Sequence, residues 1–210
     1  MTRLLVLTDR AQAEAVGHTL RGVVTAALEA GAREVLLREK DLPAPARRRV
    51  AEHLAAHAAA AGAALYVASD IALAWYVDAQ GVHLSAEDPW PEDHPGLPWG
   101  RSCHTVEDLV EAQRRGAAWA TLSPVFTTMS KPGYGPPLGL GGLAAGAHRA
   151  LGLPVLALGG IVPGRARGCV EAGAAGVAVM GAVMGADHPA AVVRAMLGEL
   201  GDMAPLRSPP

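Results

Sequence analysis

The stretch EVLLREK, residues 34–40, is an apolar run of strand length that ends on charged residues. Side chains alternate across a strand, so we expect Arg38 and Lys40 on one side, about 6.5–7 Å apart, and Glu39 on the other. Two cations on one side of a strand end suit a polyanion. The alternative is that both cations pair with carboxylates at the rim of the sheet.

Similar short apolar runs recur along the chain. They are RLLVLT (3–8), ALYVAS (64–69), GVHLS (81–85), PWGRS (98–102), WATLS (119–123), PVLAL (154–158) and GVAVM (176–180). Between most of them lie stretches that predict helices, often introduced by Ser, Thr, Asp or Pro: 19–30, 46–61, 70–79, 105–115, 142–151, 163–172 and 187–200. Eight strands alternating with helices favour a closed (β/α)8 barrel of the TIM type over an open doubly wound sheet. The segment 85–97 is expected to be a loop.

The composition predicts one domain and excludes several classes of function. The chain has 210 residues, of which 1–200 fit one barrel domain and 201–210 are expected to be a disordered tail. A formal net charge of −2 argues against nucleic-acid or anionic-membrane partners. The two cysteines lack metal-ligand spacing, and we expect neither a signal peptide nor a membrane-spanning segment. We therefore expect a soluble, cytoplasmic protein with reduced thiols.

In this barrel type the reactive groups lie at the carboxyl ends of the strands. The polar residues expected at that mouth are Arg38, Lys40, Ser69, Asp70, Asp88, Ser102 and His104. The loop 123–142 after the sixth strand is much longer than an ordinary connection. Its threonines, serine, lysine, prolines and glycines favour a lid that covers a substrate.

Asp70 and Asp88 follow neighbouring strands, so their carboxylates could converge at the mouth. Two carboxylates repel each other, and Mg²⁺ resolves the repulsion by taking one or two of them together with water and phosphate oxygens. The sequence thus suggests a magnesium site. The alternative interpretation is a helix cap for Asp70 and a turn residue for Asp88.

A second anion site is suggested on the opposite side of the mouth. Gly159 and Gly160 end the seventh strand, and Met180 and Gly181 end the eighth, where this fold often binds phosphate through backbone N–H groups. A Gly-Gly pair alone could equally be a tight turn. His83 and His104 are assigned no role. Two anion sites in one mouth suggest a reaction that joins two phosphorylated molecules.

The ordered motifs resemble the thiamine phosphate synthases of the ThiE/TenI superfamily from residue 3 to about 200. The motifs are LTDR, LLREK, VASDIALA, GVHLSAED, GRSCHT, SPVFTTMSKPG, ALGGI and GVAVM. The resemblance implies that hydroxymethylpyrimidine diphosphate is coupled to hydroxyethylthiazole phosphate, giving thiamine phosphate and pyrophosphate. It implies roles for the following residues: Arg38, Lys40 and Lys131 at the diphosphate and leaving pyrophosphate, Asp70 and Asp88 at Mg²⁺, Ser102 at the aminopyrimidine, and Thr128, Ser130, Gly160, Met180 and Gly181 around the thiazole phosphate.

The resemblance also implies a mechanism and shows two departures. Pyrophosphate leaves first, and the thiazole nitrogen then traps a pyrimidine methylene cation. Ser69 stands where the family usually has Asn, and Gly181 where it often has Ser. The alternatives are a TenI-like thiazole tautomerase and a non-catalytic thiazole-phosphate-binding paralogue. The tautomerases typically carry a catalytic His at the position of Pro124 and lack the two metal carboxylates. This chain has proline at that position and keeps both carboxylates.

Overall fold

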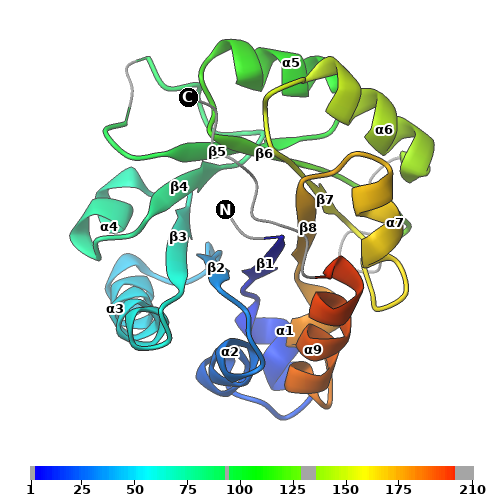
Figure 1. The fold of residues 1–210 in the computed structure, drawn as a ribbon. Coiled ribbons are helices and arrows are strands. Elements are labelled where there is room, and N and C mark those ends of the chain that lie inside the picture. Colours follow the sequence, from blue (N-terminus) through cyan, green and yellow to red (C-terminus); the bar gives the residue numbers. More distant parts are fainter. Residues whose placement is uncertain (1–2, 93–94, 129–135, 202–210) are drawn as a thin grey trace.

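The computed structural model describes residues 3–92, 95–128 and 136–201, which form a closed barrel of parallel strands (Figure 1). The strands are β1 (Leu4–Leu7), β2 (Glu34–Leu37), β3 (Ala64–Ala68), β4 (Gly81–Leu84), β5 (Trp99–Cys103), β6 (Trp119–Leu122), β7 (Val155–Leu158) and β8 (Gly176–Val179). β1 pairs in parallel with both β2 and β8, which closes the ring. The predicted (β/α)8 barrel is confirmed, and the open sheet is excluded.

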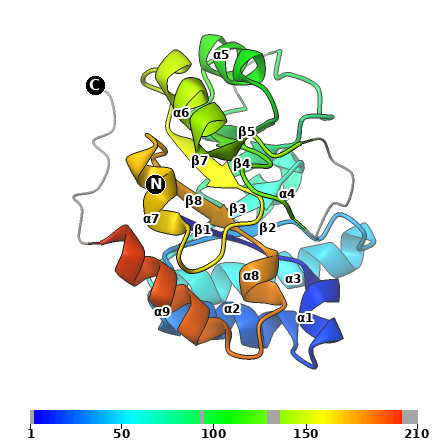
Figure 2. The same cartoon turned by 90° about the vertical axis from the view of Figure 1, so that its right-hand side faces the viewer.

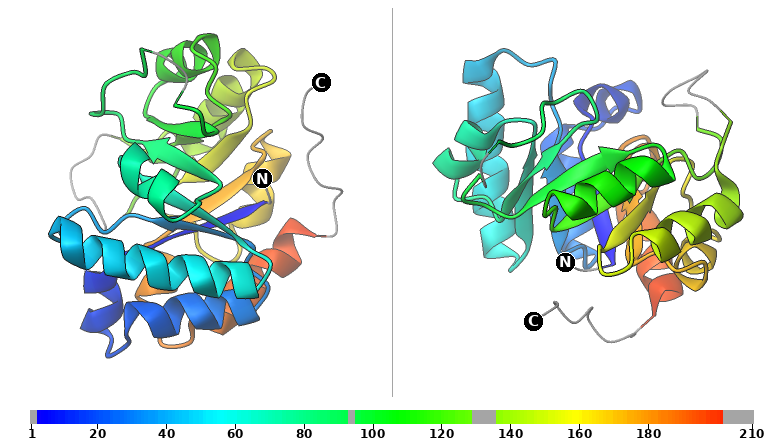
Figure 3. Two further views of the ribbon diagram at one scale, coloured as in Figure 1. Left: turned by 90° about the vertical axis from the view of Figure 1, so that its left-hand side faces the viewer. Right: turned by 90° about the horizontal axis from the view of Figure 1, so that it is seen from above.

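Helices surround the strands. They are α1 (Arg10–Ala15), α2 (Leu20–Glu29), α3 (Ala44–Ala60), α4 (Ile71–Tyr76), α5 (Val106–Arg114), α6 (Gly139–Arg149), α7 (Ala166–Glu171), α8 (Gly181–Met184) and α9 (Pro189–Leu200). α2 packs beside α9, and α5 beside α6 (Figure 2). Figure 3 shows α2 and α3 running side by side on the outside of the barrel. The short helices α1 and α8 were not predicted, whereas the other seven lie where the sequence places them.

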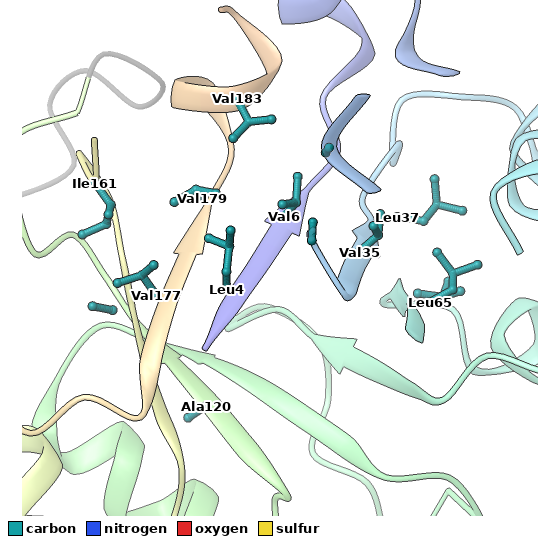
Figure 4. Packing of buried hydrophobic residues seen from close by; sticks show 14 of the residues in the cluster. Leu4, Val6, Val35, Leu37, Leu65, Ala120, Ile161, Val177, Val179 and Val183 are labelled. Carbon is teal, nitrogen blue, oxygen red and sulfur yellow. The ribbon is translucent and has the colours of Figure 1, made fainter. Parts of the chain in front are cut away.

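Alternation along the strands divides the apolar residues into two layers. Leu5, Leu7 and Leu36 belong to a cluster inside the barrel, together with Tyr66 and Trp119. Their strand neighbours point outward and pack under the helices. Figure 4 shows part of this outer layer, including the labelled Leu4, Val6, Val35, Leu37, Leu65, Val177 and Val179. The polar mouth is therefore built on strands that are buried on both faces.

Helix caps fix where the chain leaves the mouth. Thr105 and Asp108 form a capping box at the start of α5, where the sequence predicts a helix. Asp70 accepts a hydrogen bond from the backbone N–H of Leu73 at 2.8 Å and so caps α4. The alternative interpretation of Asp70 as a helix cap is thus correct, although a cap can still have a second role.

The described parts of the connecting loops also agree with the predictions from the sequence. Residues 85–92 and 95–97 contain no helix or strand. In the long loop after β6, α6 begins at Gly139, three residues before the predicted helix. The tail prediction and the middle of the lid prediction concern residues 202–210 and 129–135, which lie outside the described residues. Both cysteines are buried and free. No helix among the described residues is long and apolar enough to cross a membrane.

Candidate active site

A cavity of about 690 Å³ opens at the carboxyl ends of the strands. Seven of the predicted site residues line it: Arg38, Lys40, Ser102, Thr128, Gly160, Met180 and Gly181. Ser69, Asp70 and Asp88 are not among its lining residues and lie at the ends of β3 and β4. Ser130 and Lys131 lie outside the described residues. Described residues expected at both anion sites therefore line one cavity.

The charged residues after β2 alternate as predicted. Arg38 and Lys40 both line the cavity, whereas Glu39 is buried on the other side. The Glu39 carboxylate accepts hydrogen bonds from the backbone N–H of Arg10, at 3.1 and 3.2 Å. Burial raises the pKa of Glu39, although hydrogen bonds from Thr8 and Arg10 act against that rise. Glu39 therefore holds the start of α1, and the two cations on either side of it face the cavity.

The surroundings of Asp88 favour its carboxylate form. Its Oδ2 atom accepts hydrogen bonds from the Ser69 hydroxyl and, at 2.6 Å, from the backbone N–H of Ser85. Burial acts to raise the pKa of Asp88, but these hydrogen bonds and the charge of Lys40 outweigh it and leave that pKa below its ordinary value. Asp88 is therefore an anion beside the cationic side of the cavity.

Arg101 fixes the loop that carries Asp88. Its side chain is 4 % exposed and donates hydrogen bonds to the backbone carbonyls of Asp88 at 2.8 Å and Ala86 at 3.0 Å. Its guanidinium also lies 3.9 Å from the centre of the Trp90 ring. Because the loop contains no helix or strand in its described part, this buried arginine supplies the contacts that keep Asp88 in place.

Asp70 has a partner that the sequence does not reveal. Its Oδ2 atom lies 2.9 Å from Arg47 Nη2, on α3, while Oδ1 caps α4. The arginine also donates a hydrogen bond to the backbone carbonyl of Ala68. A metal ion would have to share Asp70 with this arginine.

The donor set at the ends of β3 and β4 fits Mg²⁺. Asp70 and Asp88 leave neighbouring strands, and Asp88 is held ionised. Mg²⁺ commonly takes one or two carboxylates and completes its shell with water and substrate phosphate oxygens. Within the described residues there is no cluster of three or more His, Cys, Asp or Glu side chains, so such an ion would depend on water and phosphate for its remaining ligands.

Ser69 lies in the left-handed region of the backbone, with φ = 62°. That region costs most L-residues about 1–2 kcal/mol, but Asn adopts it readily. This gives a physical reason for the Asn that is usual in the family at this position. The Ser69 hydroxyl compensates here by donating its hydrogen bond to Asp88.

We expect Ser69→Ala to lower the free energy of unfolding by about 1–2 kcal/mol at pH 7, because it removes a hydrogen bond to a charged group and keeps the backbone strain. The hydrogen bond stabilises the ionised form of Asp88, whose folded pKa is depressed. Its contribution is therefore present above the unfolded pKa, near 4, and lost as pH falls through the folded pKa. Urea unfolding at pH 7 and pH 3 measures this, and an equal loss at both pH values would contradict it. Ser69→Asn, which tolerates the backbone angle and keeps a donor, should match or exceed the wild type.

The opposite side of the cavity is built from turns after β7 and β8. Gly160 has φ = 64°, and a Cβ atom at this position would lie 2.4 Å from the Thr127 carbonyl oxygen. Glycine is thus required where the chain after β6 comes close to the turn after β7. Gly181 begins α8 directly after β8 and also lines the cavity. The Gly-Gly pair is therefore both a tight turn and part of the cavity wall.

Some lining residues were missed by the sequence analysis. Arg165 lines the cavity, lies 4.7 Å from the centre of the Phe126 ring and donates a hydrogen bond to the Gly160 carbonyl at 2.8 Å. Its place five residues after the glycine turn could have identified it. His104, which the sequence places at the mouth without a role, also lines the cavity, and its Nδ1 atom lies 2.8 Å from the Ser123 carbonyl oxygen.

A closed (β/α)8 barrel with cations and a glycine turn around one carboxyl-end cavity defines a class, the barrel enzymes that act on small phosphorylated molecules. Comparison with known sequences identifies the member of that class. The sequence profile described as "Thiamine monophosphate synthase" matches residues 4–183. The chain belongs to the thiamine monophosphate synthase family.

Individual relatives agree with this assignment. The chain is 42 % identical over 198 residues to the thiamine-phosphate synthase of Roseiflexus castenholzii, covering 91 % of this chain and 85 % of the relative. It is 40 % identical over 197 residues to the thiamine-phosphate synthase of Roseiflexus sp. (strain RS-1), covering 91 % and 82 %. Among solved structures, it resembles thiamine phosphate pyrophosphorylase from Pyrococcus furiosus with a TM-score of 0.82 and 30 % identity, covering 94 % and 95 % of the two chains.

Proposed function

We propose that the protein is a thiamine-phosphate synthase that joins hydroxymethylpyrimidine diphosphate to hydroxyethylthiazole phosphate and releases pyrophosphate. The single observation that carries the proposal is the shared cavity. It places Arg38 and Lys40 on one side and the turns at Gly160 and Gly181 on the other. The relatives are named thiamine-phosphate synthases, which agrees with thiamine phosphate as the product.

The residues of the cavity suit a dissociative reaction. The bond between the pyrimidine methylene carbon and the diphosphate oxygen breaks, and its electron pair stays on the oxygen. Arg38 and Lys40 then stabilise the negative charge that develops on pyrophosphate. The lone pair of the thiazole nitrogen forms the new C–N bond, so no proton has to be removed and no general base is needed.

We further propose that Asp70 and Asp88 hold Mg²⁺ beside the diphosphate. When bound, the ion would neutralise part of the charge on the leaving group. The lowered pKa of Asp88, to which hydrogen bonds from Ser69 and Ser85 and the charge of Lys40 contribute, supports this.

The two alternative functions have less support. A tautomerase of the TenI type would carry a catalytic His in place of Pro124, and Pro124 lines the cavity without a group that can transfer a proton. A phosphate-binding paralogue would have no need for Arg38, Lys40 and Asp88 to lie near one another. None of the relatives compared above is described as a tautomerase or as a non-catalytic protein.

The decisive experiment incubates the pure protein with both substrates and Mg²⁺ and measures thiamine phosphate. We expect product that depends on each of the three additions. Conversion of a thiazole carboxylate phosphate tautomer without metal or pyrimidine would instead indicate the tautomerase. Calorimetric uptake of thiazole phosphate without product over a long incubation would indicate the binding protein.

Arg165 should strengthen binding of the thiazole phosphate, because it is the one charged side chain among the cavity-lining residues between positions 158 and 182. We expect Arg165→Ala to raise KM for the thiazole phosphate about 5–10-fold, the effect of one exposed charge-assisted hydrogen bond, and to leave KM for the pyrimidine substrate unchanged. Steady-state kinetics with each substrate varied in turn measures both. Arg167→Ala is the matched control, since Arg167 is exposed on α7 and does not line the cavity. An equal effect of the two variants would contradict a specific role.

A further inference from the structure

His83, Gly100 and Trp119 lie in a row across three neighbouring strands inside the barrel. In the strand register His83 is paired with Gly100, and Gly100 with Trp119. Because the middle residue has no side chain, the imidazole and the indole meet above it. A Cβ atom at Gly100 would lie 2.2 Å from Trp119 Nε1 and 2.7 Å from His83 Nδ1. The glycine is thus required for contact between the other two residues.

This contact fixes the tautomer of His83. Trp119 Nε1 lies 3.1 Å from His83 Nδ1, and both side chains are buried. An indole N–H can only donate a hydrogen bond, so Nδ1 of His83 has to accept it and cannot carry a hydrogen. The hydrogen of the neutral ring is therefore on Nε2. Burial, with smaller effects from the charges of Lys40 and Arg101, lowers the pKa of His83 to about 3, which agrees with a neutral ring.

The tautomer in turn determines the direction of the next hydrogen bond. His83 Nε2 lies 3.0 Å from the Ser102 hydroxyl oxygen and 3.5 Å from the Thr121 hydroxyl oxygen. Since Nε2 carries the hydrogen, Ser102 Oγ accepts the shorter of these bonds. The Ser102 hydroxyl hydrogen then has to point away from His83, and Ser102 lines the cavity.

We propose that Trp119 and His83 are positioning residues that make Ser102 a hydrogen-bond donor to a ring nitrogen of the pyrimidine substrate. The inference rests on the proposed function for the identity of the ligand. An aminopyrimidine offers Ser102 two different groups, the ring nitrogen beside the amino group, which accepts, and the amino group, which donates. Because the hydrogen bond from His83 directs the Ser102 hydroxyl hydrogen toward the ligand, Ser102 selects rings that have an accepting nitrogen at this position.

The first test reads the tautomer in the ligand-free protein. Correlation of the imidazole ¹⁵N and ¹H signals of His83 distinguishes a protonated from an unprotonated nitrogen. We expect the hydrogen on Nε2 in the wild type and a mixture of both tautomers in Trp119→Phe. Trp75→Phe is the matched control, because it removes an indole donor at the surface, where Trp75 bonds to the Pro95 carbonyl. A wild-type spectrum with the hydrogen on Nδ1 overturns the proposal.

The second test measures recognition by calorimetry, without turnover. The two ligands are the pyrimidine diphosphate and an analogue in which the ring nitrogen beside the amino group is replaced by C–H. We expect the wild type and Trp75→Phe to bind the analogue about 10-fold more weakly, and Ser102→Ala and Trp119→Phe to discriminate only about 2-fold, the effect of one hydrogen bond. Unchanged discrimination in folded Trp119→Phe, or in Ser102→Ala, overturns the proposal. If neither ligand binds to the wild type, the proposed function fails, while the imidazole spectrum still decides whether His83 is oriented as described.

Discussion

A Lys40→Met variant should lose about 10²–10³-fold in kcat/KM for thiamine phosphate formation, the usual cost of removing one group that stabilises developing negative charge. Lys40 lines the cavity beside Arg38, and its charge acts on both Asp88 and His83. The methionine keeps most of the length of the side chain and removes only the charge. Because the charge is needed most when the diphosphate departs, the loss should appear mainly in kcat.

Two further variants separate this effect from a general loss of positive charge. Lys40→Arg keeps the charge, so it should recover a large part of the activity although its fork-shaped head differs from an ammonium. Arg49→Met removes a cation from the exposed surface of α3 and should leave kcat/KM within about 2-fold of the wild type. Steady-state kinetics with magnesium in excess measures all three. A Lys40→Met enzyme with the wild-type kcat would exclude a role for this lysine in the departure of pyrophosphate.

The fold could be predicted because each strand carries its own local signal. A run such as LLVL in β1 is apolar on both faces, which is what a strand between a packed interior and a helix layer requires. Helix starts were readable where caps exist, as at Thr105. α8 was missed because a helix of four residues is too short to show an apolar period, and α1 because its sequence, RAQAEA, has no apolar side chain larger than alanine.

The site was predictable to the extent that barrel geometry brings strand ends together. That rule places Arg38, Lys40 and Ser102 at one mouth without knowledge of their partners. Contacts between residues that are distant in the sequence could not be predicted in this way. Nothing in the sequence indicates that Arg47 reaches Asp70, or that a glycine at position 100 allows His83 to meet Trp119. Such contacts depend on strand register and helix placement, which only the three-dimensional structure supplies.

Asp88→Asn and Asp70→Asn should each lower magnesium-dependent kcat/KM by about 10²–10³-fold, because each removes one carboxylate from a site that has few others. The amide is preferable to alanine at both positions. It keeps an acceptor for the backbone N–H of Leu73 at one position and for Ser69 and Ser85 at the other. Loss of activity can then be assigned to the missing charge rather than to an uncapped α4. Asp78→Asn is the control, since Asp78 is exposed, lies beyond the end of α4 and has φ = 51°, which Asn also adopts.

Asp70→Asn and Asp88→Asn should differ in the magnesium concentration that each needs for half-maximal rate. Asp70 shares its carboxylate with Arg47, so removing the charge of Asp70 also frees an arginine side chain at the end of β3. That cation can replace part of the lost metal interaction, and the magnesium concentration for half-maximal rate should rise less in Asp70→Asn than in Asp88→Asn. Asp88→Asn releases no comparable cation, because Lys40, whose charge acts on Asp88, already lines the cavity, and the hydrogen bonds to Asp88 come from Ser69 and Ser85. Titration of activity with Mg²⁺ orders the two variants, and a larger rise for Asp70→Asn would mean that Asp70, despite its arginine, is the stronger ligand.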